Sequence, residues 1–174
     1  MIISVENLRE ITDINLSHEQ LLMKLKALEL FIRNYTHNNF QMREIRSQSE
    51  TENNLILNPP EHISIGDTIQ ISDSLLNNGI YTVTDISEKG MLVSERLIDC
   101  KKNLVTKVYY PDDVVEGVVN LLKWDIYSRD KTGIQSEKLS RHSVSYFNLD
   151  SENSVMGYPY SLMGFLKPYM KARF

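Results

Sequence analysis

Residues 61–72, Glu61-His-Ile-Ser-Ile-Gly-Asp-Thr-Ile-Gln-Ile-Ser72, alternate apolar and polar side chains as a half-buried β-strand does. The pair Asn78-Gly79 that follows can adopt positive φ, which a tight turn between antiparallel strands requires. A second alternating run, Ile80-Tyr-Thr-Val-Thr-Asp-Ile86, comes next. The sequence therefore predicts a β-hairpin in the middle of the chain.

This hairpin belongs to a larger predicted β module. Alternation and turn residues predict strands over residues 67–72, 80–87, 90–96 and 105–110. Pro59-Pro60 enforces an extended entry into the module, and Pro111 ends it. Strands that are so few and so short would leave exposed edges and a thin core unless the sheet closes, so the pattern favours a small, SH3-like β-barrel.

Helical periodicity precedes the module. Ser4 is placed to cap a short helix, and Ser17 with Gln20 has the spacing of a capping box before a long helix that starts near His18. The apolar residues of the long helix recur every three or four positions: Leu21, Leu25, Leu28, Ile32 and Tyr35, widened by Leu22, Leu30 and Phe31. A helix with so wide an apolar surface is expected to pack on more than one side.

A third helix is predicted after the module, where Asp112-Asp113 supply the negative charge that a helix N-terminus favours. Its predicted inner stripe consists of Val115, Val118, Val119, Leu122 and Ile126, broadened by Val114, Leu121 and Trp124. Gly133 is expected to terminate it. Beyond that residue we expect a partly helical or extended segment to residue 146, a polar loop over 148–153, and a short helix over 160–166 broken by Pro168.

These elements predict an α+β chain in which a β module interrupts a helical frame. Residues 1–58 and 112–174 are assigned to the helical domain and residues 59–111 to the inserted module. Residues 47–54 are interpreted as a polar linker, because they are rich in Ser, Gln, Glu, Thr and Asn.

Size and composition limit the possible functions. A chain of 174 residues with 41% hydrophobic content can bury one ordinary core, or a modest core plus a small module. No apolar stretch approaches the roughly 18 to 20 residues needed to cross a bilayer, and no secretory signal is evident, so we expect synthesis and retention in the cytoplasm. The net charge of −4 argues against a surface built to neutralise phosphates.

No constellation of catalytic or metal-binding residues stands out. The single cysteine, Cys100, excludes an internal disulfide and a multi-cysteine zinc site. The four histidines lie far apart and form no metal-binding pair: His18, His37, His62 and His142. We therefore expect no enzyme activity, no metal and no cofactor.

Aromatic residues are concentrated in the last 29 residues: Tyr146, Phe147, Tyr158, Tyr160, Phe165, Tyr169 and Phe174. Such side chains need a surface to cover them. Two interpretations are open: the segment wraps around the core of its own chain, or part of it docks on a neighbouring subunit or another protein, where Tyr anchors are favoured.

Two stretches resemble the head–tail connector (adaptor) proteins of long-tailed bacteriophages: Gly133-Ile-Gln-Ser-Glu-Lys-Leu-Ser-Arg-His-Ser-Val-Ser-Tyr146 and the closing Leu166-Lys-Pro-Tyr169. A short first helix and a long second helix that ends in Phe31-Ile-Arg-Asn-Tyr-Thr36 add to the resemblance. It covers residues 1–40 and 112–174. The inserted β module departs from the smallest members of that family, in which a short loop would join the helices.

The resemblance implies a helical bundle of the connector type with an extended C-terminal arm and no catalytic residues. It implies a virion protein, located at the head–tail neck, that forms a ring of about a dozen copies beneath the portal. The implied protein partners are further copies of the chain, the portal protein, and a downstream neck or tail-completion protein. Double-stranded DNA would pass through the ring without sequence-specific recognition, and no membrane contact is implied. The implied contact residues are Tyr158, Tyr160, Phe165, Leu166, Lys167, Pro168, Tyr169 and Phe174.

An alternative interpretation starts from the β module alone. Small barrels often bind peptides or nucleic acids through a basic or aromatic face. The module has three aromatic residues, Tyr81, Tyr109 and Tyr110. The chain could therefore be a small-barrel binding module or regulator rather than a structural connector.

Overall fold

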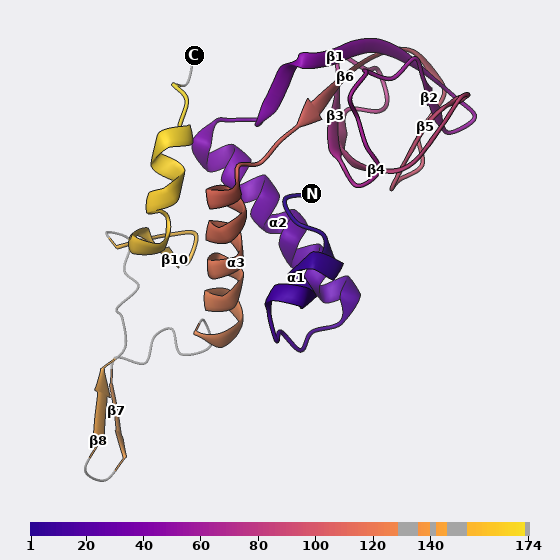
Figure 1. The fold of residues 1–174 in the computed structure, drawn as a ribbon. Helices are drawn as coiled ribbons and strands as arrows, with labels where there is room; N and C mark the ends of the chain where they lie inside the picture. Colours follow the sequence, from indigo (N-terminus) through magenta and orange to yellow (C-terminus); the bar gives the residue numbers. More distant parts are fainter. Residues whose placement is uncertain (129–135, 140–141, 146–152, 173–174) are drawn as a thin grey trace. The chain divides into compact units, whose positions relative to one another are not determined.

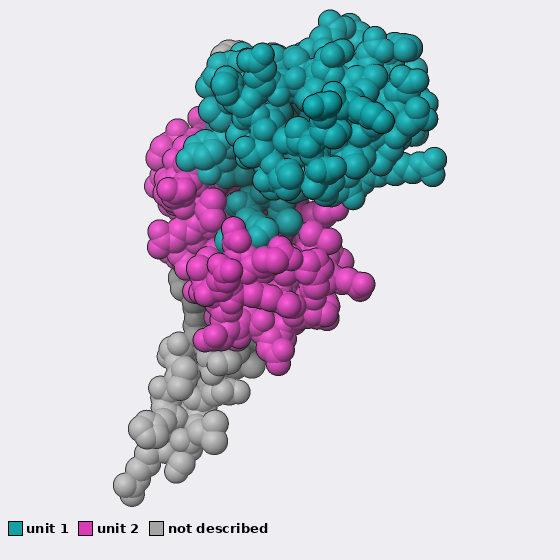
Figure 2. Space-filling model, turned by 45° about the vertical axis from the view of Figure 1, so that its right-hand side comes forward, with its two compact units in different colours: residues 1–4, 38–110 teal, residues 5–37, 111–174 magenta. Residues whose placement is uncertain are grey.

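The computed structural model describes residues 1–128, 136–139, 142–145 and 153–172. The chain divides into two compact units, coloured separately in Figure 2. The β unit consists of Met1–Ser4 and Asn38–Tyr110, and the helical unit of Val5–His37 and Pro111–Phe174. The predicted α+β class is confirmed, with helices and a closed β-barrel in one chain.

In the described part of the helical unit, three α-helices form the frame: α1 (Val5–Ile11), α2 (His18–Thr36) and α3 (Asp112–Tyr127) (Figure 1). α2 begins at the predicted capping box. Ser17 Oγ accepts a hydrogen bond from the Gln20 backbone N–H at 3.2 Å, and Gln20 Oε1 accepts one from the Ser17 N–H at 3.0 Å. The box satisfies two backbone donors that would otherwise lack partners at the helix start. Among the described residues, no helix has both the length and the hydropathy to cross a membrane.

α2 and α3 pack through apolar stripes. The buried residues of these stripes are Leu21, Leu25, Leu28 and Ile32 of α2, and Val114, Val118, Leu121 and Leu122 of α3. Lys24 Nζ lies 2.5 Å from Asp125 Oδ2, and the Asp125 side chain is only 6% exposed, so this ion pair also links the two helices. The predicted inner stripe of α3 is partly wrong. Val115 and Ile126 are only half-buried, because the buried face is centred nearer to Val114 and Leu121.

Part of the chain after α3 is described. The predicted terminator Gly133 lies outside the described residues, as does most of the predicted loop over 148–153. Within the segment predicted to be partly helical or extended, β7 (Ser136–Leu139) and β8 (His142–Ser145) form an antiparallel hairpin. The extended alternative is therefore correct for these eight residues.

The β unit is a closed antiparallel barrel of six strands (Figure 1). The strands are β1 (Gln41–Glu52), β2 (Leu55–Leu57), β3 (Thr68–Ser72), β4 (Gly79–Ser87), β5 (Gly90–Val93) and β6 (Cys100–Val108). Their order around the barrel is β1-β2-β5-β4-β3-β6. Closure gives every strand two neighbours and removes the exposed edges of an open sheet. The prediction of a small closed barrel is thus confirmed, with two more strands than the sequence indicated.

The predicted linker over residues 47–54 and the predicted module boundary at residue 59 are wrong. Residues 47–52 lie in β1, which pairs with β6 and turns into β2 through Asn53 and Asn54, both with positive φ. The β unit accordingly starts at Asn38. Residues 47–52 of the strand escaped detection because the buried side chains there, Ser49 and Thr51, are polar rather than apolar.

Apolar side chains fill most of the barrel: Ile56, Ile69, Ile71, Val83, Met91, Val93, Leu97 and Val105. A group of buried polar side chains occupies another part of the same unit: Ser49, Thr51, Ser74, Asn77 and Asn103. Buried polar groups are tolerated only when they are hydrogen-bonded, and every fully buried side-chain nitrogen or oxygen atom among the described residues has a partner.

Asn77, which is 3% exposed, is the centre of this polar group. Its Nδ2 donates to the Ile98 carbonyl at 2.8 Å and to Thr51 Oγ1 at 3.1 Å, and its Oδ1 accepts from the Ile98 N–H at 2.9 Å. Its backbone N–H donates to Ser74 Oγ at 3.0 Å. One amide side chain therefore fixes the loop between β3 and β4 to the segment before β6.

Replacing Asn77→Ala should lower the free energy of unfolding by about 2 kcal/mol, because the part-buried Ile98 N–H loses its acceptor and the buried Thr51 hydroxyl loses its donor. Urea unfolding followed by circular dichroism measures the loss. Asn120→Ala, on an exposed position of α3, is the matched control and should change stability by less than about 0.5 kcal/mol. An Asn77→Ala protein as stable as the control would contradict this assignment.

Candidate functional site

The C-terminal segment, residues 153–172, contains most of the contact residues implied by the sequence. It forms a short hairpin of β9 (Ser154–Val155) and β10 (Tyr158–Pro159), then two 3-10 helices, η2 (Tyr160–Leu162) and η3 (Gly164–Tyr169). The predicted short helix over 160–166 is correct in being helical but wrong in its form, because it is divided at Met163 into two 3-10 helices and is not broken by Pro168. Pro168 lies inside η3, in the turn closed by the Met170 N–H and the Lys167 carbonyl, where its fixed φ fits and no N–H is required.

Tyr158 anchors the start of the segment to the helices. It is 9% exposed, and its ring stacks on that of Phe31 with centroids 5.5 Å apart and an interplanar angle of 25°. The Trp124 ring lies 5.7 Å away on the other helix. Aromatic pairs at these separations add to the stabilisation from burial. The Tyr158 ring therefore contacts both α2 and α3 of its own chain.

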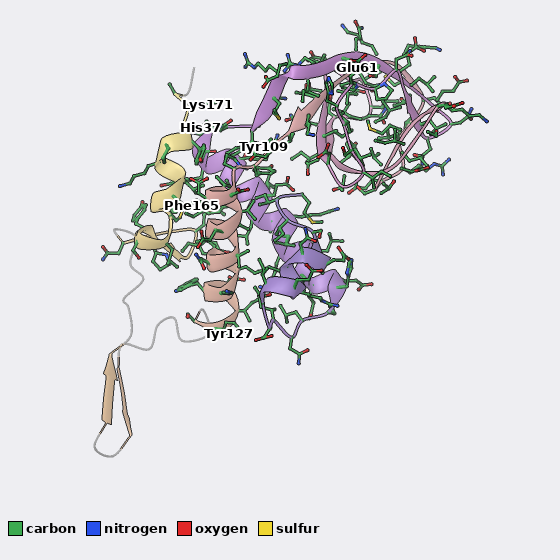
Figure 3. The ribbon with its side chains drawn as sticks, in the orientation of Figure 1. His37, Glu61, Tyr109, Tyr127, Phe165 and Lys171 are labelled. Atoms are coloured by element: carbon green, nitrogen blue, oxygen red, sulfur yellow. The ribbon has the colours of Figure 1, made fainter. Side chains whose placement is uncertain are left out.

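Phe165 and Leu166 continue the attachment, and Figure 3 labels Phe165 on the C-terminal segment beside α3. Leu166 is fully buried, and Met163 is only 3% exposed. Phe165 covers Gly117 of α3 so closely that a Cβ atom at Gly117 would lie 2.4 Å from the ring Cζ. The glycine in the middle of α3, which weakens a helix by itself, thus makes room for this ring.

Polar contacts fix the end of the segment. The Tyr169 hydroxyl donates a hydrogen bond to the Asp113 carboxylate, with oxygen–oxygen distances of 2.7 and 2.9 Å. The Lys171 backbone N–H donates to the Thr36 carbonyl at 2.8 Å. The segment is thereby attached to the start of α3 and the end of α2.

The contact residues predicted from the sequence fall into three groups. Four of them contact other parts of the same helical unit: Tyr158, Phe165, Leu166 and Tyr169. Three are exposed: Tyr160, Lys167 and Pro168. Phe174 lies outside the described residues. The segment therefore wraps around its own core, and contact of its exposed side with another chain stays a prediction.

Sequence reasoning missed two residues of this site, Met163 and Gly117. Met163 is buried in the segment, although a lone methionine in an irregular stretch gives no periodic signal. Gly117 gave a signal that could have been used, because a glycine inside a strongly apolar helix often marks close approach of another group.

A second candidate site is a groove on the β unit with a volume of about 510 Å³. Its lining consists of Asp73, Ser74, Leu75, Cys100, Lys101 and Lys102. Hydrogen bonding to the backbone of Lys102 lowers the pKa of the Cys100 thiol, and the Ser74 hydroxyl, 3.7 Å from Sγ, adds to the effect. A lowered pKa increases the reactive thiolate fraction at neutral pH.

Within the described ranges, no three His, Cys, Asp or Glu side chains are grouped so that they could hold a metal ion. Comparison with known proteins adds no assignment. No protein-family model matches the chain, and no curated protein matches its sequence.

Gly117→Ala should displace Phe165 and weaken the attachment of the C-terminal segment. In a Phe165→Ala background the same change should instead stabilise the protein by up to about 1 kcal/mol, since alanine is the better helix former. Thermal unfolding of the wild type, both single variants and the double variant completes the cycle. Equal effects of Gly117→Ala in both backgrounds would show that ring and glycine are not coupled.

Cys100 should titrate at a lower pH in the folded protein than in the unfolded chain. The rate of alkylation by iodoacetamide, followed against pH, measures the midpoint. Ser74→Ala should move that midpoint upward, because one hydrogen bond to the sulfur is lost. A folded midpoint at or above that of the urea-unfolded chain would contradict the assignment.

Proposed function

We propose that this chain is a structural virion protein that forms a ring between the portal and the tail of a long-tailed bacteriophage. In this role it is a DNA conduit and a platform for head completion and tail attachment. The observation that carries the proposal is the order of elements: a short helix, a long helix, α3 and a closing C-terminal segment. Apart from the inserted barrel, this is the order that the resemblance to connector proteins implies.

On this proposal the helical unit is the connector-type bundle and the barrel is an SH3-like insertion. The outward side of the C-terminal segment is then the surface for the portal or an adjacent subunit. Tyr160 is 46% exposed and Met170 50% exposed there, beside the exposed Lys167 and Pro168. Tyrosine exposed in this way is a favoured anchor at protein interfaces.

The charge of the chain suits a DNA conduit. A channel must let a polyanion slide without retaining it, and a strongly basic wall would bind DNA through its phosphates. The net charge of −4 gives each copy an overall repulsion towards DNA. A ring of such copies would favour passage over binding.

Phage particles assembled without this chain are expected to be heads that lack tails and are either filled with DNA or leaking it. Negative-stain electron microscopy of particles from a phage with a nonsense codon in this gene measures the outcome. The same phage complemented with the wild-type gene is the control. Normal tailed particles made without the chain would refute the proposal.

One observation favours the alternative, a small-barrel module that binds a peptide. Leu75, Leu76 and Ile98 are 85%, 55% and 55% exposed, and the hydrogen bonds of Asn77 hold their loops in place. Fixed and exposed aliphatic side chains often mark a protein contact. Nucleic acid is a poorer fit, because residues 38–110 contain seven basic and ten acidic residues. Salt-dependent binding of DNA by the purified protein would favour a nucleic-acid module instead.

A further inference from the structure

The outer face of α2 carries an apolar stripe. Met23, Ala27 and Leu30 are spaced four and three residues apart, so they lie on one face of the helix. Met23 is 67% exposed and Leu30 is 57% exposed, and Ala27 between them is exposed too. We refer to these three residues as the α2 stripe.

The α2 stripe has no explanation within the fold of the helical unit. The opposite face of the helix supplies the core through Leu21, Leu25 and Leu28, which are nearly or fully buried. A helix at a protein surface normally has a polar outer face, and one that is apolar on both faces is usually covered on both. The α2 stripe therefore calls for a covering partner.

The same helical unit has a partly apolar groove on its surface. The groove has a volume of about 300 Å³ and lies between α1 and α3. Its apolar lining comes from Ile11, Val115 and Val119, and Ile11 is 58% exposed. We refer to it as the α1–α3 groove.

The charged residues of the two surfaces are complementary. Asp112 and Glu116 line the α1–α3 groove beside its apolar residues, together with one basic residue, Lys123. Lys26 is exposed on α2 between Met23 and Leu30. A basic side chain next to the α2 stripe can thus face the two carboxylates of the groove, which outnumber its one lysine, and such a pairing is favoured over a like-charged one.

We propose that the α2 stripe of one copy of this chain docks in the α1–α3 groove of the next copy. The inference rests on the proposed ring and names the contact that builds it. Because the two surfaces differ, each copy uses its stripe on one neighbour and its groove on the other. A contact of this heterologous kind repeats from copy to copy and closes into a ring when the rotation between neighbours allows it.

Cross-linking of two cysteine variants tests the contact. Both variants carry Cys100→Ser, and one adds Leu30→Cys while the other adds Ile11→Cys. Full-length chains are mixed under conditions in which the wild type assembles, alone or on portal rings of the same phage, and treated with a short bismaleimide. The expected result is a cross-linked dimer in the mixture and none with either variant alone.

Two outcomes of this experiment would overturn the inference. A dimer from the Leu30→Cys chain alone would mean that two α2 stripes face each other rather than a groove. Absence of a dimer from a mixture that has assembled would mean that another surface, or another protein, covers the α2 stripe.

A charge placed in the α2 stripe supplies an independent readout. Leu30→Glu should abolish assembly while the helix content stays unchanged, because glutamate is a good helix former at an exposed position. Ile65→Glu, on the β unit and 63% exposed in the wild type, is the matched control and should assemble normally. Sedimentation velocity measures both.

The same measurements separate this inference from the proposed function. Rings formed by the Leu30→Glu protein would overturn the stripe contact and leave the connector role standing. A wild-type chain that stays monomeric and does not bind portal rings would remove the connector role, and with it the ring on which the inference rests.

Discussion

The pairing of β1 with β6 is the interaction on which the rest of the structure depends. It places Gln41 opposite Val108, so the chain enters and leaves the barrel on neighbouring strands. The Tyr109 N–H donates to the Phe40 carbonyl at 2.9 Å, which extends the pairing to the ends of the β unit. Because its two ends are adjacent, the barrel interrupts the sequence between α2 and α3 without preventing them from packing on each other. The helical unit therefore keeps its own core.

The sequence predicted those helices and strands whose residue pattern matches their burial and capping in the fold. α2 begins at the Ser17 capping box, and β3 shows the alternating burial of a barrel wall, whereas β4 buries Val83 alone. β1 could not be predicted in this way, because its inward side chains satisfy buried hydrogen bonds instead of filling an apolar core. The C-terminal segment shows a different limit. Its aromatic residues indicate that it must be covered, but only the fold reveals that Tyr158 and Phe165 meet Phe31 and Gly117 of the same chain.

The helical unit has apolar side chains both in its core and on its exposed surface. The inward side chains of α2, α3 and the C-terminal segment make one core, attached at its end by Tyr169 and Asp113. The outward side chains of α2 and the groove between α1 and α3 remain exposed. A connector needs both properties, since each copy must fold before assembly and must still present surfaces to its neighbours and to the portal. The second property is what the proposed ring requires, and the stability of the single copy depends on the first.

Hydrogen–deuterium exchange of the full chain, followed by mass spectrometry, tests the β1–β6 pairing most directly. If β1 pairs as described, peptides covering residues 46–52 will exchange as slowly as those covering residues 100–108, because the two strands share one ladder of hydrogen bonds. Fast exchange over residues 46–52 beside a protected β6 would contradict the account. That result would turn residues 46–52 into a linker and open the barrel between β1 and β6.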